Sequence, residues 1–110
     1  MPEIDVDQLA ERLAGGARLI DVREPDEYAN GHVPGAVLVP LGTVADQLGA
    51  FAGEGPTYVI CRTGGRSMRA CEIVAAYGSA ESAGQTVNVA GGTLAWIESG
   101  RDVVAGDRPW

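Results

Sequence analysis

The sequence predicts an α/β fold: one domain with a central, mostly parallel β-sheet flanked by helices on both faces. Three observations predict it. The chain has 110 residues, the usual size of a single domain, and 45% of them are apolar. Its short apolar runs lack polar alternation, which is typical of strands buried on both faces. Segments with helical spacing separate these runs, as in parallel β-α-β units.

The first predicted helix begins at Asp5, a residue type that caps helices. Apolar residues follow it at helical spacing until Gly15 ends the helix. A buried strand is predicted over 18–22. Pro25 then lies in the first turn of a short helix, which Gly31 ends.

The rest of the chain continues this alternation. Further strands are predicted over 36–39, 57–60 and 87–89, and further helices over 43–51, 67–77 and 93–99. Met68, Cys71, Tyr77 and Trp96 are expected to be buried apolar residues of their helices. Residues 78–85 are expected to form a polar loop, and residues 104–110 a polar tail outside a core of about 6–103.

Charge and composition exclude several classes of function. The net charge is −7, which is unfavourable for binding nucleic acid phosphates. No stretch approaches the roughly 20 apolar residues of a membrane span, and the first residues lack the basic and apolar regions of a secretory signal. With two cysteines and no export signal, the thiols are expected to be reduced. We therefore expect a cytoplasmic protein, monomeric by default, that binds neither nucleic acid nor membrane.

The segment VICRTGGRSMRAC places a cysteine, Cys61, directly after a predicted strand. Ligands of open α/β folds bind at the carboxyl ends of the strands, so this position is a candidate site. Gly64 and Gly65 allow a tightly curled loop whose N–H groups converge on an anion. The following helix adds the positive end of its dipole.

Positive charge gathers at this loop although the chain as a whole is acidic. Residues 61–71 contain three Arg and no acid, whereas the remaining residues contain five Arg and 15 Asp or Glu. An ordinary thiol has a pKa of about 8.5 and is mostly protonated at neutral pH, and such surroundings favour the thiolate. Cys61 would then be a nucleophile that needs no general base. A buried structural cysteine is the alternative interpretation.

Two chemistries use such an anion-binding loop. Phosphatases with a cysteine nucleophile need five residues between Cys and Arg, but only four separate Cys61 from Arg66 here, and Ser67 takes the phosphatase position. A loop one residue shorter suits a sulfur atom carried on the cysteine better than a tetrahedral phosphate. A phosphatase or arsenate reductase on the same fold stays the less favoured alternative.

Three motifs now indicate a family. CRTGGRS resembles the active-site loop of the rhodanese (sulfurtransferase) family, whose usual form is Cys-x-x-Gly-x-Arg-Ser. LIDVREPDEYANGHVPGAVLVP is similar to its N-terminal signature and NVAGGTLAWIESG to its C-terminal one. The resemblance covers about residues 6–103 and is to the single-domain, thiosulfate sulfurtransferase-like members.

The resemblance implies a sulfurtransferase without a cofactor. Cys61 would take the outer sulfur of thiosulfate or of a persulfide donor and pass it, as a Cys61 persulfide, to a thiophilic acceptor. The loop residues that would bind the small anionic donor and the persulfide are Arg62, Thr63, Gly64, Gly65, Arg66 and Ser67. A module that relays sulfur to a protein partner is the alternative, and either a small thiol or a protein could be the acceptor.

The other candidate residues are expected to be structural. Asp21 and Arg23 are expected to pair and tie the first predicted long strand to neighbouring loops. His32, the single histidine, has no second His or Cys pair near it in sequence, so we expect a hydrogen-bonded turn residue and no metal site. Cys71 is expected to be a core cysteine, although it could in principle resolve an oxidised Cys61.

Overall fold

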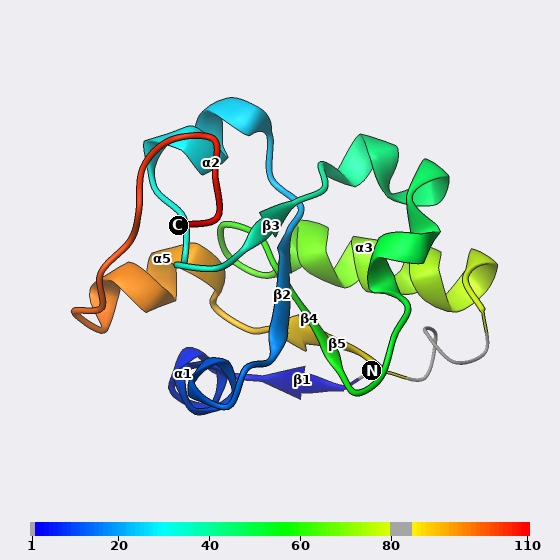
Figure 1. Ribbon diagram of the computed structural model, residues 1–110, viewed down its shortest axis with the longest axis horizontal. Helices are drawn as coiled ribbons and strands as arrows, with labels where there is room; N and C mark the ends of the chain where they lie inside the picture. The colour runs from blue at the N-terminus through cyan, green and yellow to red at the C-terminus, as the bar shows by residue number, and fades with distance from the viewer. Residues whose placement is uncertain (1, 80–84) are drawn as a thin grey trace.

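The computed structural model describes residues 2–79 and 85–110. It contains a five-stranded sheet with the strand order β1-β5-β4-β2-β3, in which every neighbouring pair is parallel (Figure 1). The strands are β1 (Glu3–Ile4), β2 (Arg18–Asp21), β3 (Val37–Leu38), β4 (Thr57–Ile60) and β5 (Thr86–Val89). The predicted parallel α/β architecture is confirmed.

Helices cover both faces of this sheet. The α-helices are α1 (Val6–Ala14), α2 (Pro25–Asn30), α3 (Gly65–Tyr77) and α5 (Gly92–Glu98). Figure 1 shows α1 and α5 together on one side, away from α3. Asp5 caps α1 as predicted, because its side chain accepts a hydrogen bond from the backbone N–H of Gln8 at 2.8 Å.

Alternate residues of the central strands pack in two separate apolar clusters. Leu19 and Tyr58 pack in the cluster that includes α1 and Trp96 of α5. Ile20 and Val59, one position further along their strands, pack in the cluster that includes α3. Since successive side chains of a strand point to opposite faces, both faces of the central strands are buried. Cys61 continues the alternation after β4 and belongs to the α3 cluster.

The predicted helix over 43–51 is wrong in type. The chain forms two short 3-10 helices there, η1 (Leu41–Asp46) and η2 (Leu48–Phe51). Gln47 between them has a φ of −129°, outside the helical region. Glycines at 42 and 49 weaken a continuous α-helix, and Val44 and Phe51 are nevertheless fully packed against the α3 side.

Two residues of α3 were expected in the core and are exposed instead. Tyr77 is 73% exposed and Met68 is 43% exposed. Tyr77 is the last residue of α3, where the helix reaches beyond the sheet in Figure 1, and the described residues leave its side chain mostly uncovered. Helical spacing alone does not show where the covering sheet ends.

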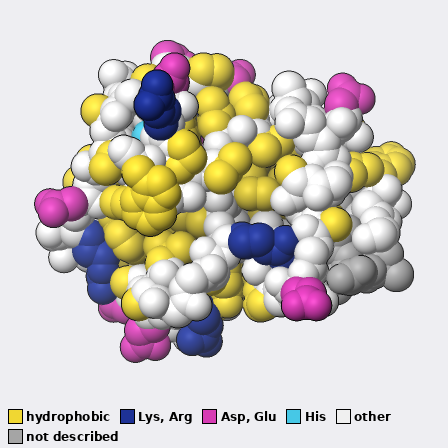
Figure 2. Space-filling view, viewed as in Figure 1, with side chains coloured by type: hydrophobic (Ala, Val, Ile, Leu, Met, Phe, Trp, Pro, Cys, Tyr) yellow, Lys and Arg dark blue, Asp and Glu magenta, His cyan; other side chains and the backbone are white. Residues whose placement is uncertain are grey.

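The C-terminal segment packs on the turn that follows α2. His32 and Val104 exchange backbone hydrogen bonds, and the N–H of Gly35 donates to the carbonyl of Pro109 at 2.8 Å. Trp110 stays 82% exposed at the end of this segment. Figure 2 shows apolar side chains gathered on the face of the molecule that Figure 1 views. Most of the predicted polar loop over 78–85 lies outside the described residues.

None of the described helices is long and apolar enough to cross a membrane.

Candidate active site

Cys61 lies where the sequence predicts, immediately after β4 at the carboxyl edge of the sheet. It is 1% exposed. Gly64 closes the loop with a φ of +111° and serves as the N-cap of α3. A residue with a Cβ rarely adopts this conformation, so the turn that returns the chain to the sulfur depends on glycine here. The helix begins at Gly65, two residues before its predicted start.

The thiol sulfur of Cys61 receives hydrogen bonds from its own loop. The N–H of Gly64 donates to Sγ at 3.1 Å, and the hydroxyl oxygen of Ser67 lies 3.4 Å from it. Burial raises the pKa of Cys61, but bonds from the Ser67 side chain and from the N–H groups of Ser67, Gly64 and Thr63 outweigh it. The pKa is therefore lowered from its ordinary value, which favours the nucleophilic thiolate.

Arg66 has a partner that the sequence analysis missed. Its guanidinium forms a two-pronged ion pair with Glu27 of α2, with N–O distances of 2.6 and 2.9 Å. The hydrogen bond to Arg66 is the main reason that the pKa of Glu27 falls to about 2. The positive charge of Arg66, which was predicted to help bind an anionic donor, is thus largely offset by a neighbouring carboxylate. In the sequence, Glu27 could be identified only as an acidic residue in the first turn of a predicted helix, with nothing to indicate Arg66 as its partner.

This ion pair predicts how stability depends on pH. Because the pKa of Glu27 is lowered from 4.5 to about 2 on folding, its contribution is complete above pH 4.5 and is lost as pH falls toward 2. Glu27→Gln should therefore lower Tm modestly at neutral pH, while the two proteins converge near pH 2. Thermal unfolding across this pH range measures the effect. A Tm difference that stayed constant down to pH 2 would contradict the assignment.

A cavity of about 200 Å³ lies beside the loop. Arg62 and Thr93 line it together with Arg23, Glu27, Asn30, Leu94 and Ile97. Arg62 and Thr63 are exposed, so their side chains are available to a ligand at the mouth of the loop. Leu94 and Ile97 are 37% and 48% exposed and add apolar surface.

The start of α5 is hydrogen-bonded to the backbone of the loop that follows β4. The N–H and the hydroxyl of Thr93 both donate to the carbonyl oxygen of Cys61, at 2.8 and 3.0 Å. The N–H of Leu94 donates to the carbonyl of Arg62 at 3.0 Å. The Gly91-Gly92 turn was visible in the sequence, but its contact with the loop was not.

Asp21 and Arg23 form a buried ion pair at the carboxyl end of β2. A guanidinium nitrogen of Arg23 lies 2.9 Å from an Asp21 carboxylate oxygen and also donates to the carbonyl of Gly31 at 2.8 Å. Their side chains are 0% and 7% exposed. The pair joins the end of β2 to the turn after α2, a geometry that fits structural support.

His32 lies in that same turn and is fully buried. Its two ring nitrogens lie 2.8 Å from the carbonyl oxygens of Tyr28 and Arg108, and its ring stacks on Tyr28 with 3.6 Å between ring centroids. Both nitrogens are therefore engaged in structure, as predicted for a hydrogen-bonded turn residue. The described residues hold no group of three or more His, Cys, Asp or Glu that could bind a metal.

Cys71 is a core residue, as predicted. It is 2% exposed within the α3 cluster and is a free thiol, as is Cys61. Burial raises the pKa of Cys71 to about 12. The two buried thiols thus differ in the direction of their pKa shifts: hydrogen bonds lower the pKa of Cys61, and burial raises that of Cys71.

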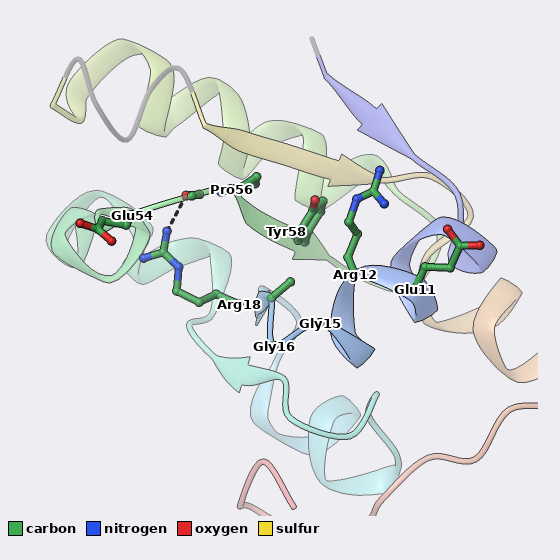
Figure 3. Close-up of a pocket in the computed structure, with 10 residues that line it drawn as sticks. Glu11, Arg12, Gly15, Gly16, Arg18, Glu54, Pro56 and Tyr58 are labelled. Atoms are coloured by element: carbon green, nitrogen blue, oxygen red, sulfur yellow. Dashed lines mark hydrogen bonds between the residues drawn. The ribbon is translucent and has the colours of Figure 1, made fainter.

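A groove larger than the cavity beside Cys61 lies at the opposite edge of the sheet (Figure 3). It encloses about 650 Å³ near the amino ends of β2 and β4, between Arg12, Gly16 and Tyr58. Arg18 in this groove donates to the backbone carbonyls of Ala52 and Gly55, so its charge supports the loop before β4. The candidate chemistry is at the other edge, where Cys61 lies.

Comparisons with known proteins agree with the geometry. The rhodanese-like domain model matches residues 5–99. A sulfurtransferase of Allochromatium vinosum is 33% identical over 105 residues, covering 94% of both chains. Thiosulfate sulfurtransferase GlpE of Pseudomonas entomophila is 32% identical over 93 residues, covering 84% of this chain and 82% of the relative. The crystal structure of a rhodanese-related protein from Thermoplasma volcanium superposes with a TM-score of 0.83 at 28% identity, covering 96% of this chain and 100% of that one. With its loop cysteine at the carboxyl edge of a parallel sheet, this chain belongs to the rhodanese-like domain family.

Proposed function

We propose that the protein is a sulfurtransferase that carries sulfur as a persulfide on Cys61. The observation that carries the proposal is the hydrogen bonding of a buried sulfur by Gly64 and the start of α3. This environment stabilises negative charge at Cys61 without a general base. The sulfurtransferases among the relatives support the same reaction class.

The reaction takes place in two balanced steps. The Cys61 thiolate attacks the outer sulfur of thiosulfate and forms a new S–S bond. The bond between the two thiosulfate sulfurs breaks, and sulfite leaves with the bonding electron pair. A nucleophilic acceptor then attacks the outer sulfur of the persulfide and releases the Cys61 thiolate. Two such half-reactions predict ping-pong kinetics.

Thiosulfate is proposed as a donor because an anion fits the mouth of the loop. Arg62 is exposed there, and the relative GlpE is named a thiosulfate sulfurtransferase. The acceptor is proposed to be a thiol with an apolar part, small or protein-borne, because Leu94 and Ile97 expose apolar surface beside Arg62. Comparing turnover with cyanide, a small thiol and a protein thiol separates a general enzyme from a relay for one protein partner.

The Arg66–Glu27 pair predicts how donors of different charge respond. Glu27→Gln removes the carboxylate that offsets Arg66 and should lower KM for thiosulfate about two- to fivefold at low salt. Arg66→Ala should raise that KM. An uncharged trisulfide donor should respond little to either variant. Equal changes for charged and uncharged donors would show that the pair acts only on structure.

Sulfur loading tests the proposed function directly. After incubation with thiosulfate, the intact protein should gain the mass of one sulfur atom, and cyanide should remove it. An unchanged mass with thiosulfate and with other persulfide donors would overturn the proposal.

A further inference from the structure

Ser67 connects Cys61 to a buried amide that the sequence analysis did not single out. The hydroxyl oxygen of Ser67 lies 3.4 Å from Cys61 Sγ and 2.5 Å from Oδ1 of Asn88. Asn88 lies on β5 and is 1% exposed. Its Nδ2 donates to Oε2 of Glu3 on β1 at 2.9 Å. A continuous row of side chains therefore joins the buried sulfur to a carboxylate on an edge strand.

Glu3 sets the direction of each hydrogen bond in this row. A carboxylate can only accept, so Asn88 must turn its NH₂ group toward Glu3 and its Oδ1 toward Ser67. The amide oxygen also only accepts, so at 2.5 Å the proton between the two oxygens is the hydroxyl proton of Ser67. A serine has one such proton. The carbonyl oxygen of Gly64, at 3.2 Å, and the sulfur of Cys61, at 3.4 Å, are the other two acceptors within reach of that single proton, and both lie farther from Ser67 than Asn88 does.

We propose that Glu3 and Asn88 are positioning residues that weaken the hydrogen bond by which Ser67 favours the Cys61 thiolate, because they draw the hydroxyl proton of Ser67 toward Asn88. The S–H of the thiol can donate to the Ser67 oxygen. After Cys61 has released its proton to solvent, the thiolate competes with Asn88 Oδ1 for the single hydroxyl proton. Donation to the sulfur leaves two buried oxygen acceptors in contact without a proton, which is unfavourable.

This weakening has a use if Cys61 carries sulfur, so its functional meaning rests on the proposed function. In the persulfide the negative charge lies on the outer sulfur, and Sγ becomes a divalent, weakly accepting atom. Ser67 can then keep its bond to Asn88. The Glu3–Asn88–Ser67 row disfavours the free thiolate but not the loaded form, so it favours sulfur loading.

The other charged residues near Cys61 do not belong to the hydrogen-bonded row of Glu3, Asn88 and Ser67. Asp21 and Arg23 pair at the end of β2, and Glu27 of α2 pairs with Arg66 of α3. Arg62 adds a positive charge in the loop itself. Glu3 reaches the site from another direction, through β1 and β5, which are paired at Glu3 and Asn88. Replacing Glu3 therefore tests the row without breaking either ion pair.

The test is the pH profile of Cys61 alkylation by iodoacetamide, in a Cys71→Ala background so that one thiol reports. In Glu3→Gln or Glu3→Ala, the amide of Asn88 can turn over and donate to Ser67, which frees the hydroxyl proton for the thiolate. Alkylation should become about threefold faster near pH 6, with the profile displaced to lower pH. Glu98→Gln, which removes an exposed acid from α5, should leave the profile unchanged.

Two further measurements separate the hydrogen-bond row from simple charge removal. In a Ser67→Ala background, Glu3→Gln should no longer change the profile, because the connection is cut. In about 1 M salt the Glu3 effect should persist, since exposed charges are screened there. An unchanged profile in both Glu3 variants, an equal shift without Ser67, or loss of the shift in salt would overturn the proposal. Alkylation does not require sulfur transfer, so this result is independent of whether sulfur loading succeeds.

Discussion

Cys61→Ser is expected to abolish sulfur loading and to reduce turnover by at least about a thousandfold. Loss of a covalent nucleophile leaves only binding and electrostatic effects. A serine hydroxyl is not ionised by the contacts that favour a thiolate, and an oxygen does not form a persulfide. The measurements are the intact mass after thiosulfate treatment and steady-state turnover with cyanide as acceptor. Residual turnover within about tenfold of the original protein would contradict the role of Cys61.

Cys71→Ala is the matched control for this result. Cys71 lies in α3, is 2% exposed, and has a pKa raised to about 12 by burial. Its loss should leave loading and turnover mostly intact. The small cavity should lower the free energy of unfolding by about 1 kcal/mol. A near-total loss of activity would instead show that Cys71 takes part in the chemistry.

The sequence was sufficient to place Cys61 because that placement depends on local patterns. Val59 and Ile60 mark a strand buried on both faces, and a glycine turn with a helix follows at once. A parallel sheet brings the carboxyl ends of its strands to one edge. The position of the thiol and the start of the anion-binding turn follow from these facts within two residues.

The site residues that were missed depend on long-range contacts. Glu27 meets Arg66 across 39 positions, and Asn88 meets Glu3 across 85. Nothing in the local spacing of these residues indicates a partner so distant. Strand β1 was missed for the same reason: at two residues, it is identified only by its pairing with β5. The pairing of β1 with β5 also places Glu3 beside Asn88, which connects it through Ser67 to the sulfur of Cys61.

Gly92→Ala is expected to be strongly destabilising and to disrupt the loop that follows Cys61. Gly92 has a φ of +62°, and a Cβ there would lie 2.4 Å from the carbonyl oxygen of Arg62 and 2.6 Å from that of Cys61. Those carbonyls accept the hydrogen bonds from Leu94 and Thr93 that hold the loop on α5. Relief of the overlap requires α5 and the loop to separate. We expect a loss of about 3 kcal/mol or more, and a Tm lower by at least about 10 °C.

Gly100→Ala is the control that separates this close approach from backbone strain. Gly100 also has a positive φ, +85°, but its added Cβ would meet no atom within 4 Å. It should therefore cost only the roughly 1–2 kcal/mol of an unfavourable backbone conformation and leave sulfur loading unchanged. Thermal unfolding of both variants, with loading measured well below each Tm, distinguishes the two costs. If the variants lost equal stability and Gly92→Ala still loaded sulfur normally, the contact between α5 and the loop would not be what positions Cys61. A larger loss in Gly92→Ala, together with impaired loading in the folded protein, would show that the close approach at Gly92 holds the nucleophile in place.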